Sequence, residues 1–388
     1  MRDAEFPRAE YQQRYERAWR LMREQGLAGL FVTGEANYRY LTGHRTQFWA
    51  SRSRPMFAVL AQGRPPVAVV TEIEQAVIRG TSWLEDIRTW LGFADDGLPV
   101  LADLFRELGF RGERVGVDFG EEMRLGLPLL SFRKLEALAE GVQFVDGSPT
   151  LWALRRVKSA GEIAYKRQAM AAAGEGFRRC FRAIRTGMTE REVQRRMAVA
   201  VLEAGADKVG FLPIHSGAGN YAKFTAEPTA RRLRRGDMLW IDAGCTVRGY
   251  WSDFNRIAAV GTASPKQQAA YRRIWEITRA CVEAVRPGLP ISDLVKVRDE
   301  AYARLGFVET GSRSGRMGHA SGLDITEPPS VGAHDHTVLE PGMVIHIEPK
   351  MILPYGYFQL EEAILVTRRG AEYLSPPAPE RLPVVGRT

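Results

Sequence analysis

Long apolar runs and paired cysteines are both missing from this chain of 388 residues. No apolar run approaches the roughly 18 residues that a membrane-spanning helix requires, and the charged first residues lack the apolar centre of a secretory signal peptide. The three cysteines, Cys180, Cys245 and Cys281, form neither a disulfide framework nor a CxxC zinc site. These absences argue against a membrane protein and a disulfide-rich secreted domain, and we expect a cytoplasmic protein with no membrane partner.

The chain is basic, with a formal net charge of +8 from 54 lysine and arginine residues against 46 aspartate and glutamate residues. Such a balance can indicate nucleic-acid binding. The densest basic cluster is Arg231, Arg232, Arg234 and Arg235, which leads into Gly236-Asp237 without a zinc-finger or RNA-binding signature. We interpret it as a solvated turn before a strand, with a phosphate-binding patch as the alternative, and expect no nucleic-acid partner.

Length and composition indicate two globular domains. Hydrophobic residues make up 45% and charged residues 26% of a chain that is too long for one ordinary core. In residues 1–155, short β-branched runs such as PPVAVV and RVGVDF alternate with helical stretches such as VLADLFREL. This alternation predicts an α/β domain.

Residues 156–388 have a different pattern. Helical periodicity continues through Leu202, and the strand-like runs DMLWIDAGCT, YWSDFNRIAAVG, GMVIHIEPKM and FQLEEAILVT follow, with a helical block at residues 265–305 in their midst. Helices and strands in separate blocks predict an α+β domain.

Acidic residues stand at the ends of apolar runs in the second domain, where burial of an unpaired charge is costly. Asp242 follows the run MLWI, and Asp253 comes eleven residues later, across a turn that contains Arg248 and Gly249. The two aspartates could therefore face each other on a β-hairpin.

Two glutamates have a similar placement, and one histidine accompanies them. Glu348 follows the run VIHI, Glu361 precedes the run AILV, and His319 lies in GRMGHASG, which we interpret as a glycine-rich loop. Four carboxylates could converge with an imidazole around two divalent cations, which would offset their charge. An oxygen-rich set with one histidine suits manganese, iron, cobalt or zinc, and two such ions can hold a water and lower its pKa toward about 7. The alternative is that each acid pairs with a nearby arginine.

The order of these residues resembles the pita-bread metallopeptidase family, which includes Xaa-Pro dipeptidases (prolidases), aminopeptidase P, methionine aminopeptidase and the creatinase relatives. The resemblance rests on the segments IDAG, SDFNR, GHASGLD, EPGM leading to IEP, and LEE, and on intervals of 11, 66, 29 and 13 residues between the five candidate ligands. It favours the prolidase/creatinase branch. It implies a creatinase/prolidase-type α/β N-terminal domain at 1–155 and an α+β pita-bread (creatinase/aminopeptidase-like) C-terminal catalytic domain at 156–388.

The resemblance also implies roles for the five metal ligands, which are Asp242, Asp253, His319, Glu348 and Glu361. Asp242 would bind one ion, Asp253 and Glu361 would bridge two ions, and His319 and Glu348 would complete the second site. Glu348 is also implied as the general base. Manganese is the metal that we expect first, with cobalt, zinc or iron as alternatives.

The sequence departs from the pattern of proline-specific members, which carry two further histidines. Thr326 stands at the first of these positions, seven residues after His319, and Thr225 or a neighbour stands at the second. Threonine can donate a hydrogen bond but cannot shuttle a proton near pH 7 as imidazole does, so Thr326 is kept as a candidate catalytic residue. Gln359 replaces an arginine that often precedes the last ligand by two residues.

Other histidines are candidates to compensate for these losses. His346 lies two residues before Glu348 on one strand face, and it either faces the site or packs in the core. His215, next to Ser216, is a second candidate. His334 and His336 are interpreted as loop residues.

The sequence therefore predicts a dinuclear metal-dependent hydrolase similar to Xaa-Pro dipeptidases, in which a metal-bridging hydroxide attacks the amide of a dipeptide or related substrate. The alternative is a non-peptidase member acting on a small molecule, similar to ectoine hydrolase, dimethylsulfoniopropionate lyase or creatinase. A binding protein on the same scaffold is disfavoured, because it would have no use for the clustered acids. The family also implies a homodimer, in which a loop with His44 and Trp49 either closes over the partner's site or is an ordinary surface loop.

Overall fold

The computed structural model describes residues 3–51, 53–91, 95–307 and 315–386 of the chain. The chain divides into two compact units, Met1–Arg155 and Arg156–Thr388. Among the described residues, no helix has both the length and the apolar character needed to cross a bilayer.

The first unit is built on one six-stranded sheet in the order β4-β3-β2-β1-β5-β6. β1 pairs antiparallel with β2, and β2 with β3, while the other pairs are parallel. The strands are β1 (Gly29–Val32), β2 (Phe57–Ala61), β3 (Val67–Thr71), β4 (Ile87–Trp90), β5 (Arg114–Val117) and β6 (Gln143–Asp146). The helices are α1 (Arg8–Gln25), α2 (Glu35–Thr42), α3 (Gln75–Thr81), α4 (Leu98–Glu107), α5 (Leu129–Leu138) and α6 (Ser148–Arg156). The predicted α/β alternation is confirmed.

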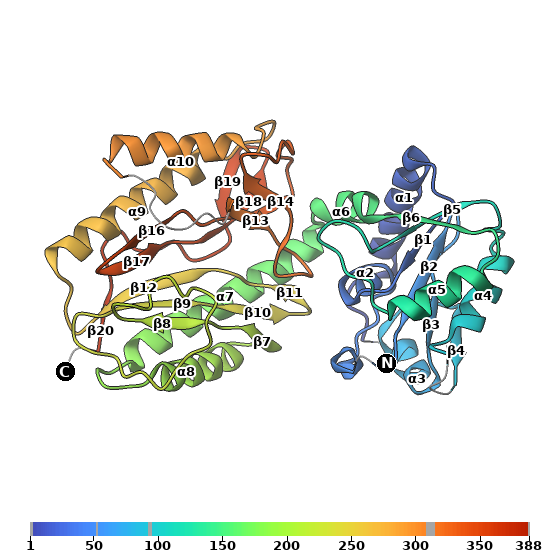
Figure 1. Cartoon of the computed structure of the whole chain (residues 1–388), viewed down its shortest axis with the longest axis horizontal. Helices are drawn as coiled ribbons and strands as arrows, with labels where there is room; N and C mark the ends of the chain where they lie inside the picture. The colour runs from blue at the N-terminus through green and yellow to red at the C-terminus, as the bar shows by residue number, and fades with distance from the viewer. Residues whose placement is uncertain (1–2, 52, 92–94, 308–314, 387–388) are drawn as a thin grey trace. The chain divides into compact units, whose positions relative to one another are not determined.

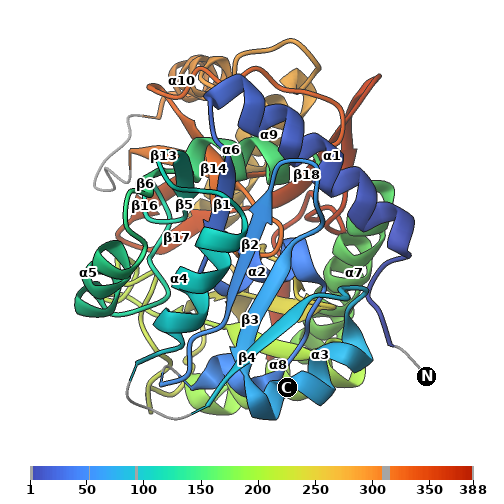
Figure 2. The same cartoon turned by 90° about the vertical axis from the view of Figure 1, so that its right-hand side faces the viewer.

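The core of the first unit lies between this sheet and α4 and α5, which Figure 1 shows on one face of the sheet, with α1 on the other. Phe31 and Val59 of the sheet pack in one apolar cluster with Leu101 and Phe105 of α4 and Phe132 of α5. Figure 2 shows β2, β3 and β4 side by side in this sheet. The periodic apolar residues of the predicted helix VLADLFREL therefore cover the sheet, as the sequence indicates.

The second unit contains several smaller sheets. Their strand orders are β11-β10-β7, β20-β12-β9-β8, β14-β13-β15-β18-β19 and β16-β17. The strands of the first two sheets are β7 (Lys208–Phe211), β8 (Ile214–Ser216), β9 (Met238–Asp242), β10 (Gly244–Val247), β11 (Tyr250–Trp251), β12 (Asn255–Val260) and β20 (Val384–Val385). Those of the other two are β13 (Arg316–Ala320), β14 (Glu327–Gly332), β15 (Val344–Ile347), β16 (Lys350–Leu353), β17 (Gly356–Gln359), β18 (Glu362–Thr367) and β19 (Gly370–Tyr373).

Four long helices flank these sheets: α7 (Ala160–Ala183), α8 (Glu190–Glu203), α9 (Pro265–Ala284) and α10 (Asp293–Arg304). Figure 1 shows α7 and α8 on one side of the strands of this unit and α9 and α10 on the other. The sequence signals the helix starts clearly, because Ser159 and Glu162 form a capping box on α7 and Thr189 and Glu192 form one on α8. The strands that hold the candidate ligands are thus enclosed between two helical layers.

The arginine cluster at residues 231–235 lies before β9, as predicted, but only Arg235 is in a turn, Arg232 forms a β-bridge with Thr189, and Arg231 is not simply solvated. Its guanidinium donates to Asp237 Oδ2 at 2.7 Å and to Ser216 Oγ at 2.7 Å. Arg232 donates to the backbone oxygen of Gly187 at 2.9 Å. These contacts attach the segment to its own unit.

Candidate metal centre

The two candidate aspartates lie near the ends of adjacent antiparallel strands. Asp242 is the last residue of β9, and Asp253 comes two residues before β12. Arg248 and Gly249 form the predicted turn, with φ of 48° and 75°. The prediction that the two aspartates face each other on a hairpin is wrong in register, because Asn255 is the residue opposite Asp242. The β12 ladder begins only at this asparagine, so Asp253 lies outside it.

The other candidates come from the sheet that contains β13, β15 and β18. His319 lies on β13, His346 on β15, Glu348 directly after β15, and Glu361 directly before β18. β15 pairs antiparallel with β18, with His346 opposite Ala363. Strand ends from two sheets therefore supply the candidate side chains.

The interpretation of the His319 segment as a glycine-rich loop is wrong, because the segment forms β13. Gly318 allows a close approach between strands: a Cβ at this residue would lie 1.9 Å from the backbone oxygen of His346. Only glycine tolerates such a contact. The glycine that suggested a loop brings the β13 and β15 backbones together.

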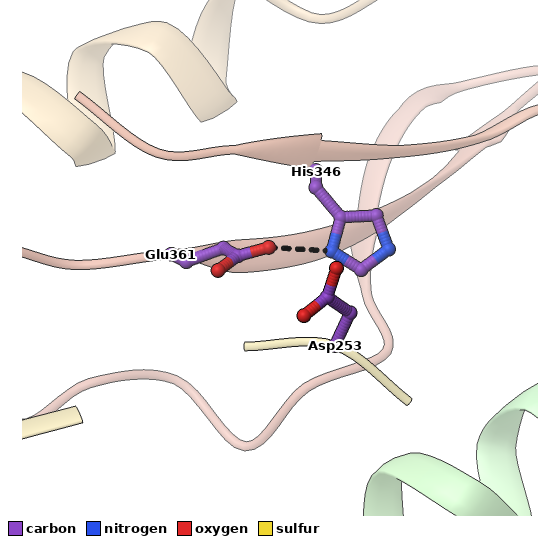
Figure 3. Close-up of side chains that lie close together, drawn as sticks. All are labelled: Asp253, His346 and Glu361. Carbon is purple, nitrogen blue, oxygen red and sulfur yellow. Dashed lines mark hydrogen bonds and ion pairs between the residues drawn. The ribbon is translucent and has the colours of Figure 1, made fainter. Parts of the chain in front are cut away.

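The tightest cluster among the described residues is formed by Asp253, His346 and Glu361 (Figure 3). Each residue offers one potential ligand atom, and these atoms lie within 4.8 Å of one another. Nδ1 of His346 is 2.9 Å from Oε1 of Glu361. All three side chains are buried, so the cluster brings two acids together in a place that water hardly reaches.

His319 adjoins this cluster through Asp253. Its Nε2 is 3.5 Å from Oδ2 of Asp253, and its Nδ1 is 2.9 Å from the backbone oxygen of Ala320. A carbonyl oxygen only accepts, so Nδ1 carries the hydrogen when the ring is neutral. Burial lowers the pKa of His319, which favours that neutral ring and leaves the Nε2 lone pair available on the side of Asp253.

The charges of the four candidate carboxylates repel one another, with Asp242, Asp253 and Glu361 buried and Glu348 half-buried. Burial, followed by the charge of Glu348, raises the pKa of Asp242 to about 7. Burial followed by the charge of Asp242 raises the pKa of Asp253 well above its usual range, and burial followed by the charge of Asp253 does the same for Glu361. Oδ1 of Asp242 is buried and has no hydrogen-bond partner. Without a cation, Asp253 and Glu361 favour their protonated forms.

Arginine does not neutralise this group. Within the described parts of the chain, no arginine side chain forms an ion pair with any of the four candidate acids. Arg256 instead pairs with the neighbouring Glu362 at 2.9 Å, and Ser375 Oγ and the Ala378 amide also donate to that glutamate. Glu361 and Glu362 thus have opposite environments, one among acids and one among donors.

The donor set fits divalent cations. It offers carboxylate oxygens, an imidazole nitrogen with a free lone pair, and the unpartnered Oδ1 of Asp242, and oxygen ligands with few histidines suit manganese and similar ions. Buried acids of this kind are stable as anions only when paired or bound to metal.

Comparison with known proteins agrees with this geometry. Residues 164–368 match the family model of metallopeptidase family M24, a span of more than half the chain. The chain belongs to metallopeptidase family M24. Residues 14–157 match the creatinase/prolidase N-terminal domain, so the predicted fold class and family resemblance are confirmed. As a member of this family, the chain is a hydrolase that uses divalent metal ions.

Several relatives of this M24 protein span most of its length. It is 27% identical over 363 residues to the putative dipeptidase YkvY of Bacillus subtilis, covering 93% of this chain and 97% of that one. It is 30% identical over 250 residues to the Xaa-Pro dipeptidase of Pyrococcus horikoshii, covering 64% and 71% of the two chains. The crystal structure of dipeptidase PepE from Mycobacterium ulcerans matches with a TM-score of 0.84 at 28% identity, covering 98% of this chain and 99% of that one.

The remaining candidates of the M24 unit have different surroundings. His215 is buried on β8, with its ring stacked on Trp240 at 4.8 Å between centroids, and neither ring nitrogen has a hydrogen-bond partner. Burial lowers its pKa to about 4. Thr326 is half-buried in the bend before β14. His334 lies in an exposed turn and His336 in an exposed loop, as predicted.

Sequence reasoning noted Gln359 only as the loss of an arginine, but the structure gives it clear contacts. Its Nε2 donates to Oε2 of Glu348 at 2.7 Å, while its Oε1 accepts from Nε1 of Trp240 at 3.1 Å and from the Tyr357 hydroxyl at 3.0 Å. The two acceptor contacts fix which end of the amide faces the glutamate. Asn255 was also missed: its Nδ2 lies 3.4 Å from Oε2 of Glu361.

Proposed function

We propose that this M24 protein is a dinuclear metal-dependent dipeptidase that resembles Xaa-Pro dipeptidases and hydrolyses a dipeptide or a related amide. The observation that carries the proposal is the group of four carboxylates, three of them buried and Glu348 half-buried, with no arginine partner among the described residues. Two divalent ions would offset four negative charges, and the names of the relatives from Bacillus subtilis and Pyrococcus horikoshii support a dipeptidase.

The proposed ligands are Asp242, Asp253, His319, Glu348 and Glu361, with manganese as the proposed metal. When bound, the ions supply Lewis acidity that lowers the pKa of water and polarises the carbonyl of the scissile amide. Asp253 and Glu361, which share the tightest cluster, are proposed to contact both ions.

Glu348 is proposed as the general base. Its Oε2 is held by Gln359, so the carboxylate has a fixed orientation. A carboxylate in a fixed position can take a proton from water and return it to the leaving amine. Thr326 would donate a hydrogen bond where proline-specific members have a histidine, and His346 and His215 would shape the site.

Hydrolysis of Ala-Pro, compared with Ala-Ala and with small cyclic or N-acyl amides, tests this proposal. The chelator-treated protein should be inactive, and manganese should restore cleavage of at least one dipeptide. A protein fully loaded with manganese that cleaves no dipeptide would refute the dipeptidase assignment.

The second candidate is a small-molecule amide hydrolase or lyase that uses the same metal site. It is favoured by the absence of two histidines of proline-specific members, with Thr326 at the first position and Thr225 or a neighbour at the second. In the same screen, cleavage of a small amide without cleavage of any dipeptide would support this second function.

The family resemblance also supports a homodimer. Light scattering of the purified protein should give twice the chain mass of 43.4 kDa, and a monomeric mass would contradict this part of the proposal.

A further inference from the structure

Four buried polar side chains form a continuous hydrogen-bonded chain that ends at a proposed metal ligand. Lys166 Nζ, on α7, is 2.5 Å from Ser321 Oγ, which follows β13. Ser321 Oγ is 2.7 Å from Nε2 of His346, and Nδ1 of His346 is 2.9 Å from Oε1 of Glu361. Three of these residues are fully buried and Glu361 is 2% exposed. Residues far apart in the sequence are thus joined in one hydrogen-bonded chain.

The direction of the hydrogens along this chain follows from its two ends. Lys166 Nζ donates at one end, and a metal-ligating carboxylate, being ionised, only accepts at the other. The Ser321 oxygen therefore accepts from Lys166, and its own hydrogen points to Nε2 of His346. That leaves Nδ1–H of His346 to donate to Glu361. Lys166 also donates to the backbone oxygen of Trp251 at 2.5 Å, which holds the first donor in place.

This arrangement fixes both oxygens of Glu361. Oε1 accepts from His346, and Oε2 lies 3.4 Å from Nδ2 of Asn255. The His346 ring also stacks on His319, with centroids 5.0 Å apart and planes at 16°. One imidazole therefore contacts two proposed ligands.

His346 is itself close enough to be considered as a ligand, because its Nδ1 belongs to the tight cluster with Asp253 and Glu361. However, both of its ring nitrogens already have partners in the hydrogen-bonded chain. No lone pair of the neutral ring is left for a metal ion. A positioning role fits these contacts better than ligation.

We propose that Lys166, Ser321 and His346 act as positioning residues that hold Glu361 in the orientation required for metal binding. The inference rests on the proposed dinuclear site. Mutation of a hydrogen-bond partner of a metal ligand typically weakens metal affinity by about 10–100-fold. The loss of affinity should therefore be measurable by metal binding, without any assay of activity.

Two substitutions at residue 346 separate the two ends of the ring. The amide nitrogen of asparagine lies as many bonds from Cα as Nδ1 of histidine does. The amide nitrogen of glutamine lies as many bonds from Cα as Nε2 of histidine does. His346→Asn can therefore keep the donor to Glu361, and His346→Gln loses it while it stays near Ser321. Ser321→Ala removes the hydroxyl, and Ser321→Thr keeps it. Lys166→Met removes the first donor.

The experiment is titration of each chelator-treated variant with Co²⁺, followed by its visible absorption and by competition with a chelator. Circular dichroism confirms that each variant is folded. We expect about a 10–100-fold weaker Co²⁺ affinity in His346→Gln, near wild-type affinity in His346→Asn and Ser321→Thr, and intermediate losses in Ser321→Ala and Lys166→Met. Lys158→Met, which removes another buried lysine, one paired with Glu327 at 3.0 Å, is the control and should keep the wild-type cobalt spectrum.

The outcomes distinguish the inference from the function beneath it. If His346→Gln binds Co²⁺ as tightly as the wild-type protein does, the inference is overturned. The metal site itself is still upheld in that case, because the wild-type protein binds Co²⁺. Equal losses in His346→Asn and His346→Gln, with an altered cobalt spectrum in both, would make His346 a ligand and also overturn the inference. A wild-type protein that binds no cobalt would contradict the proposed function and the inference together.

Discussion

Asp118 in the first unit and the candidate metal ligands in the second unit are acids buried in opposite ways. In the first unit, Asp118 is 1% exposed and accepts hydrogen bonds from the Thr33 amide and hydroxyl, the Gly34 amide and the Asn37 side chain, at 2.7 to 3.2 Å. Each of its oxygens has at least two donors. Such a carboxylate joins β5 to the turn between β1 and α2, and its role is structural.

In the second unit, the buried acids of the candidate metal centre face one another instead. The charges of Asp242 and Glu348 are the largest causes, after burial, that raise the pKa of Asp253. The contrast shows that burial alone does not indicate a site: what indicates one is a buried acid whose neighbours are acids.

Asp253→Asn should have the largest effect of the changes that test this contrast. The amide removes one charge from the tightest cluster and cannot bridge two cations as a carboxylate does. We expect a fall in kcat of more than about 100-fold, beyond the usual effect of an outer-shell partner, measured with the substrate that the screen identifies. Activity within a few-fold of wild type would contradict the role of Asp253.

Asp118→Asn should instead affect stability and leave the metal site unchanged. Its NH₂ group would face the donors of Thr33 or Gly34 and leave a buried amide unsatisfied, at a cost of about 3 kcal/mol. Hydrogen exchange of peptides from residues 3–51 measures this loss. In the chelator-treated protein, Asp253→Asn should cost nothing and can stabilise, because it removes repulsion. Equal destabilisation by both substitutions would remove the contrast between the units.

The smallest expected effect is the pH dependence of stability that His44 gives to the first unit. His44 is buried, and although Glu74 Oε2 lies 3.2 Å from its Nε2, burial lowers the pKa of His44 to about 4. In the unfolded chain its pKa is near 6.5, so the unfolded state binds the extra proton first as pH falls. The contribution of His44 to the free energy of unfolding is therefore complete above pH 6.5 and is lost progressively as pH falls from 6.5 to about 4.

Replacement of His44 tests this sign. The stability difference between pH 7 and pH 5, measured by hydrogen exchange in the first unit, should shrink by about 2 kcal/mol in His44→Gln. The exposed His336→Gln is the control. An unchanged pH dependence in His44→Gln would show that Glu74 compensates for burial.

Much of the fold could be predicted from local sequence signals. The capping boxes at Ser159 and Thr189 mark helix starts, and the apolar runs before Asp242 and Glu348 mark strands. These signals depend on neighbouring residues. The failure at His319 has the same origin, because Gly318 suggests a loop locally and its actual use, close packing against β15, depends on a strand far along the chain.

For the same reason, only part of the candidate metal centre could be predicted from the sequence. Acids at the ends of apolar strands are conspicuous in a sequence, so the candidates could be named. The chain from Lys166 through Ser321 to His346 could not, because no spacing relates residues on α7, β15 and the segment after β13 until they are folded. Gln359 likewise looked like a loss until its contacts with Glu348 were known.

The central claim is that the acids of the second unit converge because cations hold them together. Equilibrium dialysis of the chelator-treated wild-type protein against Mn²⁺ tests it most directly, with Asp253→Asn and Asp118→Asn alongside. We predict two tightly bound ions per chain in wild type and Asp118→Asn, and fewer in Asp253→Asn. A folded wild-type protein that binds no Mn²⁺, or an Asp253→Asn variant that binds it as wild type does, would contradict the account.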